Sequence, residues 1–166
     1  YQISEGQLVS IKKDNRIGGY IPKSIIDFTK KYEYIRFNFY QKTSIDEIKK
    51  DWSNKLNENN KEFIDFPVIS VYSPLAYFPQ AVGIFVMRII QMPPIGLLYG
   101  ARFFSLLFWT FFVFAAIRKI PSFKFVFFTL ALIPMSLFIN SSVSADVITN
   151  ALSFYTIAFF IYLAKS

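Results

Sequence analysis

The sequence predicts an all-α polytopic membrane protein fragment, in which three transmembrane helices and one interfacial helix follow a small, mostly helical N-terminal region. Composition is the first observation behind this prediction, because 54% of the 166 residues are hydrophobic. The second is the distribution of charge: ten of the 11 acidic residues and 12 of the 18 basic residues lie within residues 1–70. The third is that residues 71–166 contain long apolar runs and carry too little charge for a water-facing surface.

Residues 1–70 have the composition of a soluble segment, and we predict two helices in them. Ser44 and Glu47 form a capping-box pattern, which is followed at helical spacing by an apolar stripe of Ile45, Ile48, Trp52 and Leu56. A second helix is expected to begin at Pro22. Between these helices, residues 34–40 alternate in polarity and predict a strand. A turn and a polar loop are expected at Gly18-Gly19 and at residues 57–62.

Residues 71–94 are predicted to form the interfacial helix. The apolar stretch between Pro79 and Pro93 is too short to span a bilayer. On a helical wheel, Gln80, Arg88 and Gln91 share one narrow polar face, which suits a helix lying along the outer leaflet with Arg88 among the headgroups.

Residues 95–118, 123–140 and 146–164 are the three predicted transmembrane helices. The first run is long enough to cross a bilayer, and the other two are near the lower limit, since a span needs about 20 mostly apolar residues. The alternative is the buried helical core of a soluble protein. Three such runs in succession leave too little polar surface to cover them, so we favour the membrane.

The loops between these runs predict their orientation. Residues 118–124 contain three basic residues and no acid, whereas residues 140–146 contain one acid and no base. The positive-inside rule places the first loop and Lys165 in the cytoplasm. Residues 1–70 and 140–146 are then extracytoplasmic, in a multi-pass protein of the cytoplasmic membrane.

Composition also excludes several classes of function. The chain has no Cys and no His, which removes a thiolate nucleophile, an imidazole base and the usual zinc sites, so no metal site is predicted. Most of the net charge of +7 lies in the apolar part, where it orients a membrane protein, and no nucleic-acid partner is expected. Because the chain begins with Tyr1 and stops just after an apolar run, we expect it to be an internal piece of a longer protein.

Two charged residues of the apolar part are the main candidates for a site. Asp146 shares a helical face with Ser142 and Asn150. This stripe could line a cavity that binds substrate or metal, or Asp146 could simply stabilise a helix N-terminus. Arg102 lies about two turns inside its run, where it could either bind a lipid phosphate or extend to the outer headgroups.

Three further polar residues, Tyr72, Tyr77 and Gln80, flank two prolines where the polar part meets the membrane. Anchoring at the interface is the simpler interpretation of the tyrosines.

The order of motifs resembles a known family. The motifs are Tyr72-Ser73-Pro74-Leu75-Ala76-Tyr77-Phe78-Pro79-Gln80, Gly100-Ala101-Arg102-Phe103, Ala131-Leu132-Ile133-Pro134-Met135, and Ser142-Val143-Ser144-Ala145-Asp146 with Asn150. Together with the segments 1–6 and 19–24, they resemble the bacterial polytopic family catalogued as domain of unknown function 2142 (DUF2142).

That family is similar to the C-type (GT-C) glycosyltransferases, membrane enzymes that use polyprenyl-phosphate-linked sugars. The resemblance implies a GT-C-like fold, with the three runs as spans two to four, and a role in assembling cell-envelope glycans. It implies a lipid-linked sugar as donor and leaves the acceptor and any cofactor unknown. The substrate-binding residues it indicates are Tyr72, Tyr77, Gln80, Arg102, Asp146 and Asn150.

The family's acidic Pro-Asp-Glu motif would precede Tyr1, so we assign no catalytic residue within the chain. The alternative is a non-catalytic membrane scaffold or a transporter component of envelope polymer export. An acidic motif after an upstream span would favour the enzyme.

Overall fold

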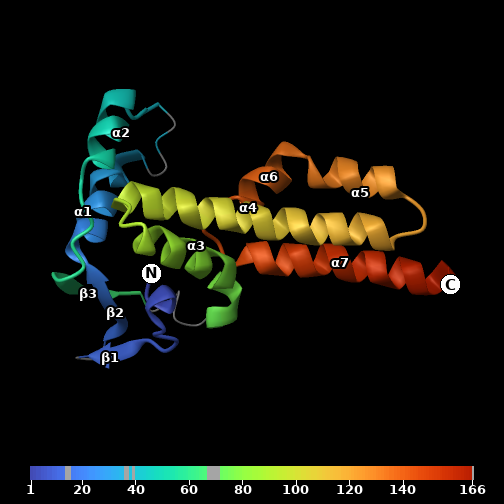
Figure 1. Ribbon diagram of the computed structural model, residues 1–166, viewed down its shortest axis with the longest axis horizontal. Helices are drawn as coiled ribbons and strands as arrows, with labels where there is room; N and C mark the ends of the chain where they lie inside the picture. The colour runs from blue at the N-terminus through green and yellow to red at the C-terminus, as the bar shows by residue number, and fades with distance from the viewer. Residues whose placement is uncertain (14–15, 36–37, 39, 67–71, 166) are drawn as a thin grey trace. The chain divides into compact units, whose positions relative to one another are not determined.

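The computed structural model describes residues 1–13, 16–35, 38, 40–66 and 72–165, which form two compact units. The N-terminal unit comprises Tyr1–Tyr72 with Ile84–Gly100, and the helical unit comprises Ser73–Gly83 with Ala101–Ser166 (Figure 1).

A three-stranded antiparallel sheet lies in the N-terminal unit, in the order β1 (Ile11–Lys13), β2 (Arg16–Pro22), β3 (Lys61–Asp65). The prediction of a mostly helical region missed this sheet. Gly18 and Gly19 lie inside β2 and form no turn, and the predicted polar loop at 57–62 runs into β3. At Gly18 a side chain has no room, because a Cβ there would lie 1.8 Å from the carbonyl oxygen of Ile64.

Two helices, α1 (Lys23–Lys31) and α2 (Ile45–Trp52), accompany the sheet. The predicted starts are confirmed: α1 follows Pro22, and Ser44 caps α2 by accepting a hydrogen bond from the Asp46 amide. The predicted apolar stripe is wrong, since Ile45 is 70% exposed and α2 ends before Leu56. Short 3-10 turns occupy Ile3–Glu5 (η1) and Glu33–Ile35 (η2).

The predicted strand at 34–40 is wrong at its start, because Tyr34 and Ile35 belong to η2. Residues 36, 37 and 39 lie outside the described residues.

The buried residue of α2 is an acid. Asp51 is 2% exposed, and its carboxylate accepts hydrogen bonds from Lys31, Asn54 and the Tyr32 hydroxyl. Burial alone would raise the pKa of Asp51, but the hydrogen bonds from Lys31 and Tyr32 outweigh it and hold the pKa below its usual value. Burial, with the hydrogen bond to Asp51, raises the pKa of Tyr32. This cluster joins α1 to α2.

The predicted interfacial segment forms the 3-10 turn η4 (Pro74–Tyr77) and the helix α3 (Phe78–Ile89). The helix ends in a C-capping arrangement in which the Gln91 amide bonds the Arg88 carbonyl and the Met92 amide bonds the Met87 carbonyl. Gln91 adopts φ 58°, the left-handed position that glycine usually takes in this cap.

Helices α4 (Pro94–Lys119) and α7 (Asp146–Lys165) cover the first and third predicted spans. In the described part of the chain, these two helices are long and apolar enough to cross a membrane. Only 33% and 17% of their most apolar stretches are buried, which is unlike the core helix of a soluble protein.

Within the helical unit, α4 and α7 run in the same direction (Figure 1). The segment that connects them in sequence forms α5 (Lys124–Ala131) and α6 (Pro134–Asn140), which run in the opposite direction. Two clusters hold the helices together, around Trp109, Val113, Ala131 and Ala151, and around Ala116, Ile120, Phe127 and Ala158. Fully buried alanines allow the backbones to approach closely, as small residues do at helix contacts within membranes.

The second predicted span, 123–140, is not one continuous helix. The chain leaves the helical conformation at Ile133, whose ψ is 132°, because the following Pro134 disfavours the α region. Proline also lacks the N–H that would continue the helix. The Ser136 hydroxyl donates to the Leu130 carbonyl (3.1 Å) and partly replaces the lost bond.

Replacing Pro134 by alanine is expected to join α5 and α6. The new amide can then donate to the Leu130 carbonyl, and amide hydrogen exchange over residues 132–136 should slow by about tenfold. Pro121→Ala, in the linker before α5, is the control and should not change exchange in this stretch. Unchanged exchange in Pro134→Ala would show that packing, rather than proline, imposes the break.

Candidate functional site

The side chain of Arg102, on α4, makes one hydrogen bond. Its Nε donates to the Ser141 carbonyl at the end of α6, at 3.0 Å. Within the described residues, no hydrogen bond or ion pair engages its terminal guanidinium nitrogens. The bond to Ser141 fixes the side chain and leaves two donor groups available for an anion.

Gln80, near the start of α3, contacts the same loop. Its Nε2 donates to the Ser144 carbonyl at 2.8 Å, and the residue is 2% exposed. Its Oε1 is buried and has no partner among the described residues. A buried acceptor without a donor costs about 1–3 kcal/mol, so this oxygen suits a hydroxyl or water donor. Arg102, on α4, and Gln80, on α3, thus both donate hydrogen bonds to backbone carbonyls of the 141–144 loop.

Asp146 begins α7 beside this loop. Its carboxylate accepts the Ser144 hydroxyl at 2.6 Å, and the same hydroxyl accepts from the Asp146 amide. The side chain is exposed and keeps further acceptor capacity. It also sits where a negative charge stabilises a helix N-terminus.

The predicted stripe of Ser142, Asp146 and Asn150 is not joined into one network. Ser142 donates to the Ile139 carbonyl, and Asn150 donates to the side chain of buried Asn140. Each stripe residue is thus engaged by its own neighbour in α6 or in the loop that precedes α7.

The two predicted tyrosines fall in different units. Tyr77 lies in η4, which packs against α7 in the helical unit. Tyr72 belongs to the N-terminal unit and is 55% exposed. Of the six predicted substrate-binding residues, Gln80, Arg102 and Asp146 therefore meet around one loop.

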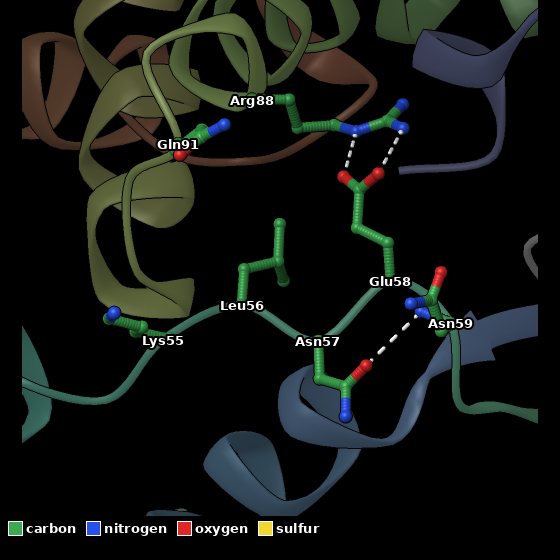
Figure 2. Close-up of a pocket in the computed structure, with 7 residues that line it drawn as sticks. All are labelled: Lys55, Leu56, Asn57, Glu58, Asn59, Arg88 and Gln91. Atoms are coloured by element: carbon green, nitrogen blue, oxygen red, sulfur yellow. Dashed lines mark hydrogen bonds and ion pairs between the residues drawn. The ribbon is translucent and has the colours of Figure 1, made fainter.

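The N-terminal unit contains a pocket that sequence reasoning missed. Its volume is about 640 Å³, and its lining comprises Lys55, Leu56, Asn57, Glu58, Asn59, Arg88 and Gln91 (Figure 2). Two of these, Arg88 and Gln91, were singled out in the sequence as one polar helix face. That periodicity was the available signal, but it does not reveal the residues 55–59 that close the pocket.

Arg88 was predicted to lie among the headgroups, but its side chain forms ion pairs at the edge of this pocket. Its Nε and Nη2 bind the two carboxylate oxygens of Glu58 at 2.7 and 3.1 Å, and Nη2 also reaches Glu5 at 3.3 Å. The Tyr1 ring lies against the guanidinium, 4.7 Å from its central carbon. The hydrogen bond from Arg88 lowers the pKa of Glu58 despite burial, so this carboxylate is charged at neutral pH.

No group of three or more Asp or Glu residues that could hold a metal ion occurs within the described ranges. Comparison with known proteins identifies one family, described as predicted membrane protein (DUF2142), whose match extends over residues 1–166. No curated protein and no solved structure matches the chain. Since the match covers the whole sequence, the chain belongs to the DUF2142 family of predicted membrane proteins.

Proposed function

We propose that the chain is part of a GT-C-like membrane glycosyltransferase that takes its sugar from a polyprenyl phosphate and assembles cell-envelope glycans. The full protein is then a multi-pass protein of the bacterial cytoplasmic membrane. The observation that carries this proposal is Arg102, which is fixed through Nε and keeps its terminal nitrogens available in an apolar helix. A phosphate on a lipid is an anion that can reach such a position.

The charges at the other end of the helical unit support the orientation. Lys165 bonds the Ser122 hydroxyl at 2.6 Å, and the Lys119 ammonium lies 4.2 Å from the Tyr162 ring centre. The C-terminal ends of α4 and α7 therefore meet, and both are basic. By the positive-inside rule this end is cytoplasmic, and Arg102 and Asp146 face the outer leaflet.

In this arrangement Arg102 binds the phosphate and offsets the charge that develops on it as the sugar–phosphate bond breaks. Asp146 accepts a hydrogen bond from the acceptor and orients it, and the buried Oε1 of Gln80 receives a hydroxyl donor. We assign the base that removes the acceptor proton to no residue of this chain.

Sugar transfer by the full-length protein in proteoliposomes, with a radiolabelled polyprenyl-phosphate sugar, tests the proposal. We expect transfer in the wild type. Asp146→Asn should lower kcat/KM by about tenfold, because one hydrogen bond from the acceptor is weakened. Asp65→Asn, in the sheet of the N-terminal unit, is the matched control and should retain transfer.

A non-catalytic scaffold or transporter component is the second candidate. The observation that favours it is that Asp146, Asn150 and Ser142 each bond a neighbouring group, which a purely structural role explains. Absence of transfer with every donor, together with normal assembly of a partner complex, would support this candidate and overturn the first.

A further inference from the structure

We infer that the pocket of the N-terminal unit binds a short neutral oligosaccharide. This binding does not rest on the proposed function. The volume of about 640 Å³ lies within the range of roughly 300–1,000 Å³ typical of small-molecule sites.

The charges around the pocket favour a neutral ligand. Arg88 is paired with Glu58 and Glu5, and Glu5 also pairs with Lys61 at 2.7 Å. These two cations and two carboxylates balance one another. Figure 2 shows the side chain of Lys55 pointing away from the Arg88–Glu58 pair. The charged edge of the pocket is therefore neutral overall, while Lys55 lines the pocket away from this edge and forms no ion pair within the described residues.

The remaining lining combines amides with an apolar surface. The amides of Asn57, Asn59 and Gln91 each contain both a donor and an acceptor, and a hydroxyl group needs both. The Asn57 Oδ1 already accepts a hydrogen bond from the backbone N–H of Asn59 at 3.2 Å and so fixes the loop. Leu56 points into the space between Gln91 and Glu58 (Figure 2). Sugars present the same combination of hydroxyl edges and apolar C–H faces.

The backbone of Gln91 is a second, independent observation. Its φ of 58° is unfavourable for a residue with a Cβ, and glycine would satisfy this cap without strain. A strained residue at the rim of a pocket points to a function for its side chain. We assign that function to hydrogen bonding of the sugar.

The test uses the full-length protein in nanodiscs and saturation-transfer NMR with maltotriose, mannotriose and chitotriose, and inorganic phosphate as a competitor. We expect at least one trisaccharide to bind and phosphate not to displace it. Gln91→Gly should weaken binding by about tenfold, the loss of one hydrogen bond, without lowering the thermal unfolding temperature. Gln41→Gly, at an exposed position outside the pocket, should bind like the wild type.

Gln91→Asn provides a second variant, because asparagine tolerates the left-handed region but is shorter; it should also weaken binding. Binding that persists in both Gln91 variants, displacement of the sugar by phosphate, or the absence of binding with all three trisaccharides would each overturn the inference. Trisaccharide binding should be unchanged in Arg102→Ala. If the sugar binds but the protein transfers none, the pocket stands and the proposed function fails; transfer without trisaccharide binding has the opposite meaning.

Discussion

Replacing Arg102 by alanine in the full-length protein is expected to lower kcat/KM for sugar transfer by about 10²–10³-fold. This is the usual effect of removing one preorganised donor that stabilises charge in a transition state. The expectation depends on the geometry of the side chain, in which the bond from Nε to the Ser141 carbonyl leaves the other nitrogens to bind phosphate. Steady-state kinetics with the lipid-linked donor measure it.

Lysine at position 102 should restore only part of this activity. It supplies a charge, but it cannot bind the Ser141 carbonyl and two phosphate oxygens with the planar fork of arginine. Arg118→Ala is the matched control, an arginine at the opposite end of the same helix that lies over the Phe114 ring; it should keep wild-type kinetics. Equal activity in Arg102→Ala and wild type would contradict a phosphate-binding role.

The second large effect is on stability. Asp51→Ala should lower the free energy of opening α1 and α2 by about 3 kcal/mol, because Lys31 and Tyr32 lose their buried acceptor. Amide hydrogen exchange of these helices in the full-length protein should then be about 10²-fold faster. Asp46→Ala, an exposed acid in the first turn of α2, should change exchange much less.

The pH dependence of this cluster has a definite sign. The pKa of Asp51 is lower in the folded protein than its ordinary value of 3.8. Its stabilising effect is therefore complete above about pH 4 and is lost as the pH falls through the lower, folded-state pKa. Protection of α1 and α2 should decline below pH 4 in the wild type. An identical decline in Asp51→Asn would assign the effect to other groups.

The long helices could be predicted closely from the sequence, and the short elements could not. Helix α4 begins one residue before the predicted range and α7 ends one residue after it, because long apolar runs determine their own secondary structure. The strands contain three, seven and five residues. Strand β3 lies about 40 residues along the chain from β2, with which it pairs, and the need for glycine at position 18 comes from Ile64 across the sheet.

The candidate site brings together three of the six residues predicted to bind substrate, and the connections between these three were not predicted. Sequence reasoning selected Arg102, Gln80 and Asp146, yet it joined Asp146 to Asn150 by helical spacing. The observed links run through the carbonyls of Ser141 and Ser144, and backbone acceptors in a loop leave no pattern in side-chain types. The pocket was missed for a related reason, since Arg88 pairs with Glu58, 30 residues away.

The basic end of the helical unit has an electrical consequence. Arg118 and Lys119 lie in the last turn of α4, Lys165 lies in the last turn of α7, and Lys124 begins α5 after the linker that follows α4. A membrane leaflet rich in anionic lipid attracts each such residue by about 1 kcal/mol. Four together favour that leaflet by about 4 kcal/mol, roughly a thousandfold preference. Lipid composition would therefore add to packing in determining the orientation in which the proposed spans insert.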